Sequence, residues 1–188
     1  MPAYAVVDEN ALAQLENSLD EDEDRLQDKL DQAFRELDRL QPDLGRYLTE
    51  ELSKSTDDIA QSLGYFLIVT VFMAFREAFP TRLGSVTPDG LEAALASLAA
   101  DEALRAEDPN EVLESDDVLA MGQPALIDFV QEHVQEALEV SPEDTNLDDL
   151  DNVYRAILVE VIALSHAVQP GPGEPEPIAD GGDSEILA

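Results

Sequence analysis

The sequence predicts an all-α protein: a single helical domain of six to eight helices, followed by a flexible tail. Apolar residues recur every three or four positions in several segments, which is the period of an amphipathic helix. Prolines and capping residues stand just before these segments, where helices begin. No pair of strand-like runs with turn signals between them is present. A chain of 188 residues with 44% hydrophobic content can bury a core of its own. We expect the domain to cover residues 1–169 and the tail 170–188.

The first two predicted helices lie before residue 41. Asp8 is a suitable cap for a short helix that carries Leu12, Leu15 and Leu19. The next helix is expected over residues 26–40, where apolar residues follow a 4-3-4-3 spacing: Leu26, Leu30, Ala33, Leu37 and Leu40. This heptad-like stripe could seal the domain or pair with a second copy of the chain. Burial within the monomer is the favoured use.

The middle of the chain predicts a central helix. Pro42 is placed to begin one helix at its first-turn position. Ser55 and Thr56 are the expected caps of the next, with Asp57 and Asp58 in its first turn, where carboxylates favour the helix dipole. Residues 59–75 are apolar on nearly every side, so this helix should lie in the middle of the fold and end before Pro80.

Similar signals continue to the end of the chain. Thr87-Pro88-Asp89 predicts a helix start, with Leu91, Leu95 and Leu98 as the inner stripe. Asp108-Pro109 repeats the signal before a further short helix. Pro124 begins another helix, and a polar loop over 141–146 leads into the last one, whose apolar residues run from Leu150 to Leu164. From Pro170 onward, repeated Pro and Gly are typical of a flexible segment.

Two stretches of the sequence resemble each other. Residues 41–50 and 123–132 share the pattern Gln-Pro-x-Leu-x-x-aromatic-aliphatic-x-Glu, 82 residues apart. Each is followed by an acidic connector and a long apolar helix, and within those helices Tyr65 corresponds to Tyr154 at a separation of 89. The pattern predicts an internal repeat, approximately residues 41–79 and 123–168, made of two related helical hairpins with a further helical pair between them.

The charge of the chain is its most unusual property. Asp and Glu number 43 against 10 Lys and Arg, for a formal net charge of -33, and the acids recur in every segment. Either the chain works in a salt-rich cytoplasm, where carboxylates keep the surface hydrated, or the acidity is functional and attracts a basic partner, as a nucleic-acid mimic would. The even spread favours salt adaptation. Direct binding of nucleic acid is not expected, because no basic patch exists to neutralise phosphates.

Several classes are excluded or disfavoured by composition. The chain has no cysteine, so disulfides, thiolate catalysis and cysteine zinc sites are excluded. Residues 1–10 lack the basic start and apolar run of a signal peptide. The apolar run from Leu63 to Phe75 is about 13 residues, whereas a membrane span needs about 20. We therefore expect a cytoplasmic protein without a membrane span.

No catalytic residue or cofactor is predicted. A di-iron bundle needs Glu-x-x-His twice, but Val130 and Ala163 stand three residues before His133 and His166, the only histidines. Both histidines are expected to be solvated or to meet a helix end. The pairs Glu136/Glu139 and Asp148/Asp151 have the spacing of the acids that hold Mg²⁺ in all-α nucleotide pyrophosphohydrolases. They are the candidate metal ligands, although no metal site is predicted. Because acids are so frequent in this chain, solvated helix faces explain the pairs better.

The Gln-Pro-x-Leu-x-x-Tyr helix and the apolar helix that ends in Phe-Arg-Glu-Ala-Phe resemble a loosely defined family of small acidic bacterial all-α proteins. The resemblance covers roughly residues 40–168 and rests on degenerate motifs. That family has no assigned function, so the resemblance implies an all-α fold and transfers neither an activity nor a site.

The sequence leaves three hypotheses on function. The favoured one is a non-enzymatic helical module for protein interaction or regulation, with a halophile-type acidic surface, acting through an apolar groove or by homodimerisation. The second is a metal-dependent all-α phosphohydrolase that uses Glu136, Glu139, Asp148 and Asp151. The third is an acidic mimic of nucleic acid that binds a basic protein.

Overall fold

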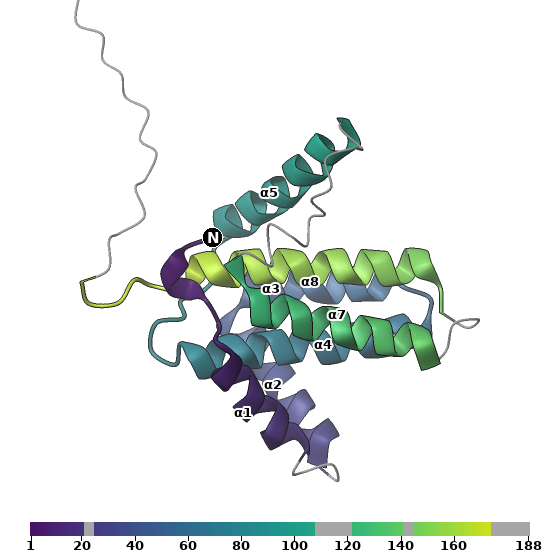
Figure 1. The fold of residues 1–188 in the computed structure, drawn as a ribbon, viewed down its shortest axis with the longest axis horizontal. Coiled ribbons are helices and arrows are strands. Elements are labelled where there is room, and N and C mark those ends of the chain that lie inside the picture. Colours follow the sequence, from purple (N-terminus) through teal and green to yellow (C-terminus); the bar gives the residue numbers. More distant parts are fainter. Residues whose placement is uncertain (21–24, 108–121, 141–144, 174–188) are drawn as a thin grey trace, which may run out of the picture.

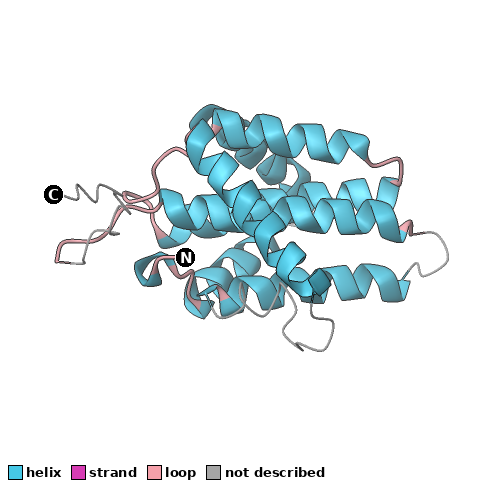
Figure 2. Cartoon of the chain, turned by 90° about the horizontal axis from the view of Figure 1, so that it is seen from above, coloured by secondary structure: helices cyan, strands magenta, loops and turns pink. Residues whose placement is uncertain are grey.

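The computed structural model describes residues 1–20, 25–107, 122–140 and 145–173, and Figure 1 shows them as a helical bundle. Within these residues the elements are a short 3-10 helix, η1, and seven α-helices: η1 (Ala3–Ala5), α1 (Glu9–Asp20), α2 (Leu26–Leu40), α3 (Pro42–Lys54), α4 (Asp58–Ala78), α5 (Pro88–Glu107), α7 (Pro124–Val140) and α8 (Leu147–Ala167). Helices and loops make up the described chain in Figure 2. The predicted all-α class is confirmed. The helix expected after Asp108-Pro109 and the tail beyond residue 173 lie outside the described residues.

The helix starts follow the proline and cap signals. Pro42, Pro88 and Pro124 each stand at the first position of a helix, where the missing proline N–H costs no hydrogen bond. The Asp8 side chain accepts a hydrogen bond from Ala11 N at 2.8 Å, and the Thr87 hydroxyl accepts one from Gly90 N at 3.1 Å. Both predicted caps are confirmed, because each satisfies one of the backbone donors left free in a first helical turn.

The cap of α4 differs from the prediction. Asp57, and neither Ser55 nor Thr56, is the cap: its Oδ1 accepts from Ile59 N at 2.7 Å and from Ala60 N at 3.1 Å. The other oxygen of Asp57 accepts a hydrogen bond from Asn146 N, and Asn146 is itself the cap of α8. The starts of α4 and α8 are therefore joined by the side chains that cap them.

Helices α4 and α8 form the centre of the molecule and run side by side in the same direction. They touch at their caps and at Gly64 against Val153, and the segments that follow them meet where Leu83 and Val168 form an isolated antiparallel bridge. A Cβ at Gly64 would lie 2.5 Å from Val153 Cγ1, so only glycine allows this approach. The prediction that residues 59–75 are central is confirmed, and Phe72 and Phe75 are fully buried.

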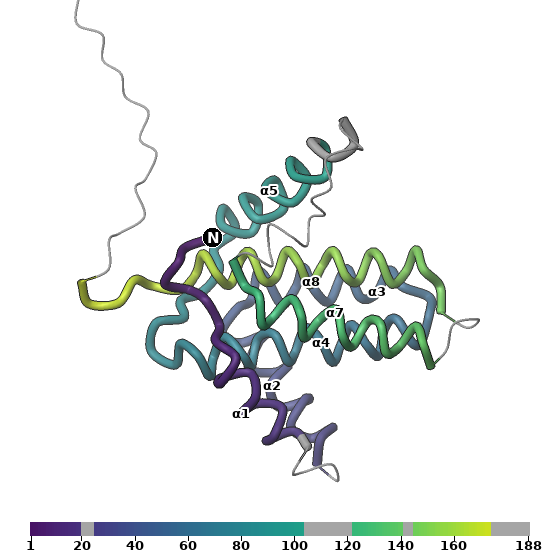
Figure 3. Tube along the Cα trace, viewed as in Figure 1, coloured from purple at the N-terminus to yellow at the C-terminus, as the bar shows by residue number. Residues whose placement is uncertain are grey.

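The remaining helices surround this pair. Helices α3 and α7 pack against α8 and α4 respectively, whereas α1 and α2 cross α4 on one side and α5 lies on α8 on the other. In Figure 1, α1 and α5 diverge from the central pair in opposite directions. Figure 3 shows that the N-terminal residues, the connection from α4 to α5 and the end of α8 gather at one end of the bundle.

Two predicted stripes have different outcomes. The Leu26–Leu40 stripe faces α4 and α3, with Leu30, Ala33 and Leu37 buried, so it contributes to the core of the monomer as favoured. On α5 the prediction was partly wrong, because Leu95 is 38% exposed while Ala94 and Leu98 are buried. The inner face of α5 therefore keeps Leu98 and the half-buried Leu91, but it has Ala94 in place of Leu95 between them.

Helix α4 is long and apolar enough to cross a membrane by composition, with a mean hydropathy of 1.6, and 56% of that stretch is buried inside the protein. The core helix of a soluble protein passes the same test. The packing of five other helices against α4 accounts for its apolar character.

Candidate functional site

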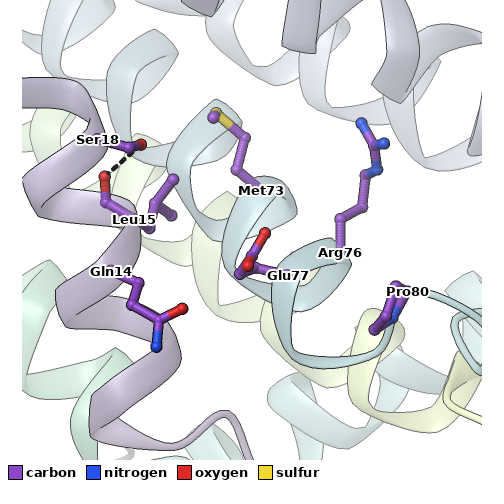
Figure 4. A pocket seen from close by; sticks show the side chains of 7 residues that line it. All are labelled: Gln14, Leu15, Ser18, Met73, Arg76, Glu77 and Pro80. Atoms are coloured by element: carbon purple, nitrogen blue, oxygen red, sulfur yellow. Dashed lines mark hydrogen bonds between the residues drawn. The ribbon is translucent and has the colours of Figure 1, made fainter. Parts of the chain in front are cut away.

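The candidate site is a groove on the surface of α4, between α1 and α2, which we call the α4 groove. It consists of two hollows of about 480 and 310 Å³ that share Ser18, Met73 and Arg76. Helix α1 supplies one wall, α2 supplies the other, and the last turns of α4 form the floor. The lining residues are Gln14, Leu15, Ser18, Lys29, Gln32, Ala33, Glu36, Met73, Arg76, Glu77 and Pro80. Figure 4 shows the hollow between α1 and α4 with its side chains.

The floor of the groove is apolar. Met73 is half-buried, and Leu15 and Ala33 are buried on the two sides of it. In Figure 4 the Met73 side chain lies between the α1 residues and Arg76. A methionine that is partly open to solvent adapts its shape to a bound apolar group, because its side chain is unbranched and polarizable.

The rim of the groove is charged. Arg76 forms an ion pair with Glu36 across the α2 side and lies over the Phe72 ring, with its guanidinium carbon 5.7 Å from the ring centroid. On the α1 side, Lys29 Nζ donates to Ser18 O at 2.5 Å, near the end of α1, where a cation favours the helix dipole. Glu77 is exposed and forms no ion pair with any described residue.

A second, smaller hollow of about 220 Å³ lies where α3, α5 and α8 meet, and its polar residues are Tyr47, Glu51, Asn152 and Arg155. Arg155 is held by Glu102 of α5, with 2.8 Å between Nη2 and Oε2. Burial, together with the Glu51 charge, raises the pKa of Tyr47 to about 12. This phenol therefore stays protonated at neutral pH, and we assign it no chemistry.

The structure does not bring the metal candidates together. Glu136, Glu139, Asp148 and Asp151 are all exposed. Within the described ranges, no three Asp, Glu or His side chains converge on a point that could hold a metal ion. Glu139 instead accepts from Gln135 Nε2 at 3.0 Å on the surface of α7.

Two other acids, Asp57 and Asp149, each accept several hydrogen bonds at the joint between α4 and α8. Asp149 Oδ2 accepts from Thr56 N at 2.9 Å and from Asp57 N at 3.1 Å. Hydrogen bonds from backbone N–H groups, that of Asn146 for Asp57 and that of Thr56 for Asp149, lower the pKa of both carboxyls. Because backbone donors occupy these oxygens, both residues have a structural role: Asp57 caps α4, and Asp149 binds the residues just before it.

His133 is placed differently from the prediction that it is solvated. Its Nδ1 lies 2.9 Å from Phe129 O, and its ring packs between Phe129 and Phe66, with centroid separations of 4.3 and 5.3 Å. The helical period puts His133 four residues after Phe129, on a face that α4 covers. His166 lies near the end of α8, where partial burial of the ring, and to a lesser extent the N-terminal ammonium, lowers its pKa. Its imidazole is therefore mainly neutral at pH 7.

Sequence analysis missed two buried glutamines as individual residues, although both open the repeated motif. Gln41 and Gln123 stand directly before Pro42 and Pro124 and are 2% and 0% exposed. Each side-chain amide binds the backbone of a distant segment. The available signal was that the same polar residue opens both copies of the motif, although any solvated residue could stand before the proline.

Comparison with protein-family models, curated proteins and solved structures gives no match for this chain. Function is therefore inferred from the α4 groove and from the charge of the molecule.

Proposed function

We propose that this protein is a non-enzymatic binding module that takes a basic, amphipathic helical segment of a partner protein in the α4 groove. The observation that carries the proposal is the half-buried Met73 on an apolar floor, flanked by the charged rim of Arg76, Glu36 and Glu77. An apolar stripe of a helix that lies in a groove of this kind is a recurrent mode of peptide recognition.

The charge of the chain supports a basic partner over an acidic one. At a net charge of -33 the field of the molecule repels an acidic segment and attracts a basic one. Locally, the two cations of the groove are already engaged, Arg76 by Glu36 and Lys29 by Ser18 O. The Glu77 carboxylate forms no ion pair with any described residue, so it can form one with a lysine or arginine of the partner.

The proposal is also compatible with a second role of the acidic residues, adaptation to a salt-rich cytoplasm. In about 1 M salt the Debye length is roughly 3 Å, so long-range attraction is screened and only contacts within the groove select a partner. A protein that works in a salt-rich cytoplasm needs such an apolar contact for specificity.

The test is a titration of two synthetic amphipathic helices that share a leucine stripe and carry either lysine or glutamate on the polar face. Fluorescence anisotropy is measured in about 1 M KCl, so that non-specific attraction is screened. We expect saturable binding of one lysine peptide per chain. Met73→Gln should weaken it about tenfold, equivalent to about 1.4 kcal/mol, and Glu77→Gln by a smaller factor.

The matched control is Leu147→Gln, which removes an apolar side chain that is 65% exposed at the start of α8. It should leave the affinity unchanged. Equal affinity of the Met73→Gln variant and the wild type would place the peptide elsewhere on the molecule. Tighter binding of the glutamate peptide would overturn the assignment of a basic partner.

A further inference from the structure

Two buried glutamines hold two extended segments in the same way. Gln41 Nε2 donates to Gly84 O at 2.8 Å, and its Oε1 accepts from Val86 N at 2.7 Å. Gln123 Nε2 donates to Ala5 O at 2.6 Å, and its Oε1 accepts from Val7 N at 2.9 Å. Each amide thus spans the carbonyl of one residue and the N–H of the residue two positions later, as a neighbouring β-strand would.

The two held segments lead into similar helices. Val7 and Val86 are both buried, and each is followed by a cap, Asp8 or Thr87, that accepts from the backbone N–H three residues on. The apolar residues of α1 and α5 then continue at the same separation of 79, with Leu12 matching Leu91 and Leu19 matching Leu98. Helix α5 therefore corresponds to α1.

The glutamines also begin corresponding halves. Gln41 precedes α3 and α4, and Gln123 precedes α7 and α8; α4 and α8 have 21 residues each, with bounds 89 positions apart. Positions that correspond at this separation touch each other in space: Asp57 accepts from Asn146 N, and Gly64 lies against Val153. Contact between equivalent positions is the mark of a two-fold axis.

The packing of the helices has the same symmetry. Helix α1 packs on α4 and α7, and α5 packs on their counterparts α8 and α3. Helix α3 packs on α8, and α7 packs on α4. In Figure 1, α1 and α5 lie on opposite sides of the α4–α8 pair, as a two-fold axis between these two helices requires.

We infer that residues 5–79 and 84–168 are, in their described parts, two copies of one helical unit, each of which uses its buried glutamine to bind the first segment of the other. The molecule is thus a covalently joined, segment-exchanged dimer. The slots at Gln41 and Gln123 are equivalent binding sites for an extended segment with valine at its third position. This inference extends the repeat predicted from sequence to α1 and α5, and it is independent of the function proposed for the α4 groove.

The first test is a graft within the full chain. Residues 5–12 are replaced by the sequence of residues 84–91, which keeps valine at position 7 and leucine at position 12. We expect one cooperative thermal transition, with a midpoint within a few degrees of the wild type. The matched control carries the sequence of residues 83–90 instead, which shifts the register by one residue and puts serine at position 7. The control should melt well below the graft. Equal loss in the two chains would show that the slots are not equivalent.

The second test measures backbone hydrogen exchange in the intact protein. Gln41→Ala should accelerate exchange at Val86 and in the first turn of α5 by tenfold or more, and leave Val7 protected. Gln123→Ala should give the opposite pattern, with Val7 and α1 released and Val86 protected. Gln135→Ala, at an exposed position of α7, should change neither segment. The inference would be wrong if either variant accelerated exchange in both segments. It would also be wrong if a variant accelerated exchange only in the first segment of its own unit.

Discussion

The most unusual residue of the core is Glu160, which stands in the middle of α8. It is fully buried, and neither of its carboxylate oxygens has a hydrogen-bond partner. Its position on the helix places it on the same stripe as Val153, Ala156 and Leu164, all of them buried. Burial raises the pKa of this carboxyl well above its ordinary value, and no charged group opposes the shift. Glu160 is therefore held as a neutral acid within an apolar core.

This carboxyl predicts a loss of stability as pH rises. Because the folded pKa lies above the unfolded one, the folded state binds the proton more tightly. The stability is therefore greatest below the unfolded pKa, and it falls as pH rises toward the folded pKa. Glu160→Leu should remove this pH dependence and raise the free energy of unfolding at pH 8 by about 1–3 kcal/mol. Urea unfolding at pH 5 and pH 8 in molar salt measures both effects. Glu77→Gln, at an exposed site, is the control. If the free energy of unfolding of Glu160→Leu fell between pH 5 and pH 8 as much as that of the wild type, the assignment would be contradicted.

Sequence periodicity could not identify Glu160 as buried or His133 as partly buried. Both are polar residues, and a polar residue in a helix normally indicates a solvated face. Their burial depends on which helices cover those positions, α4 in the case of His133, and this information lies outside the local pattern. Apolar residues show the converse: Phe72 and Phe75 belong to the stretch 59–75, which was expected to be central because it is apolar on nearly every side, and they are fully buried.

At the scale of the helix, starts were predictable where one residue type is uniquely suited to the position. Proline at the first position fixed the starts of α3, α5 and α7 to the residue. The start of α4 offered Ser55, Thr56 and Asp57 in succession, and any of them can cap a helix. Asp57 is selected as the cap because Asn146 and Asp149, which are distant in sequence, hydrogen-bond to it.

The α4 groove could not be predicted for a similar reason. The sequence indicates that α1 and α2 each have an inner face, but the opening between them depends on the angles at which they cross α4. Leu15 and Ala33 were expected to be core residues, and they are buried. That Met73 is left half-open between them follows only from the packed structure.

The joint of α4 and α8 gives a prediction for a single helix start. Asp57→Ala should lower the thermal midpoint, because it removes the acceptor for Ile59 N, Ala60 N and Asn146 N. Asp58→Ala is the matched control, since Asp58 is also a first-turn acid but does not cap the helix. The folded pKa of Asp57 is lowered, so its contribution is present above the unfolded pKa and is lost as pH falls through the folded pKa. The gap in midpoint between the two variants should therefore narrow in acid. A gap that does not change with pH would contradict this account.

At the scale of the molecule, the chain combines a large apolar core with an excess of negative charge. The core is continuous through α4 and α8 and includes residues of every described α-helix. The few cations cannot balance the surface: four ion pairs link described residues, two of them between neighbours on α3. Exposed ion pairs of this kind contribute little to stability. The fold must therefore hold together against the mutual repulsion of its carboxylates.

This balance predicts that salt stabilises the fold. The thermal midpoint should rise from low salt to about 1 M KCl, and level off when the Debye length falls to roughly 3 Å and repulsion is screened. Glu136→Gln combined with Glu139→Gln should raise the midpoint at low salt, because both exposed acids lie near the C-terminal end of α7, where negative charge opposes the helix dipole. In molar salt the variant and the wild type should melt together. A wild-type midpoint that does not respond to salt would contradict the prediction and would mean that the carboxylates are spaced too widely to repel. If the variant were still more stable than the wild type in molar salt, the cause would be local to α7.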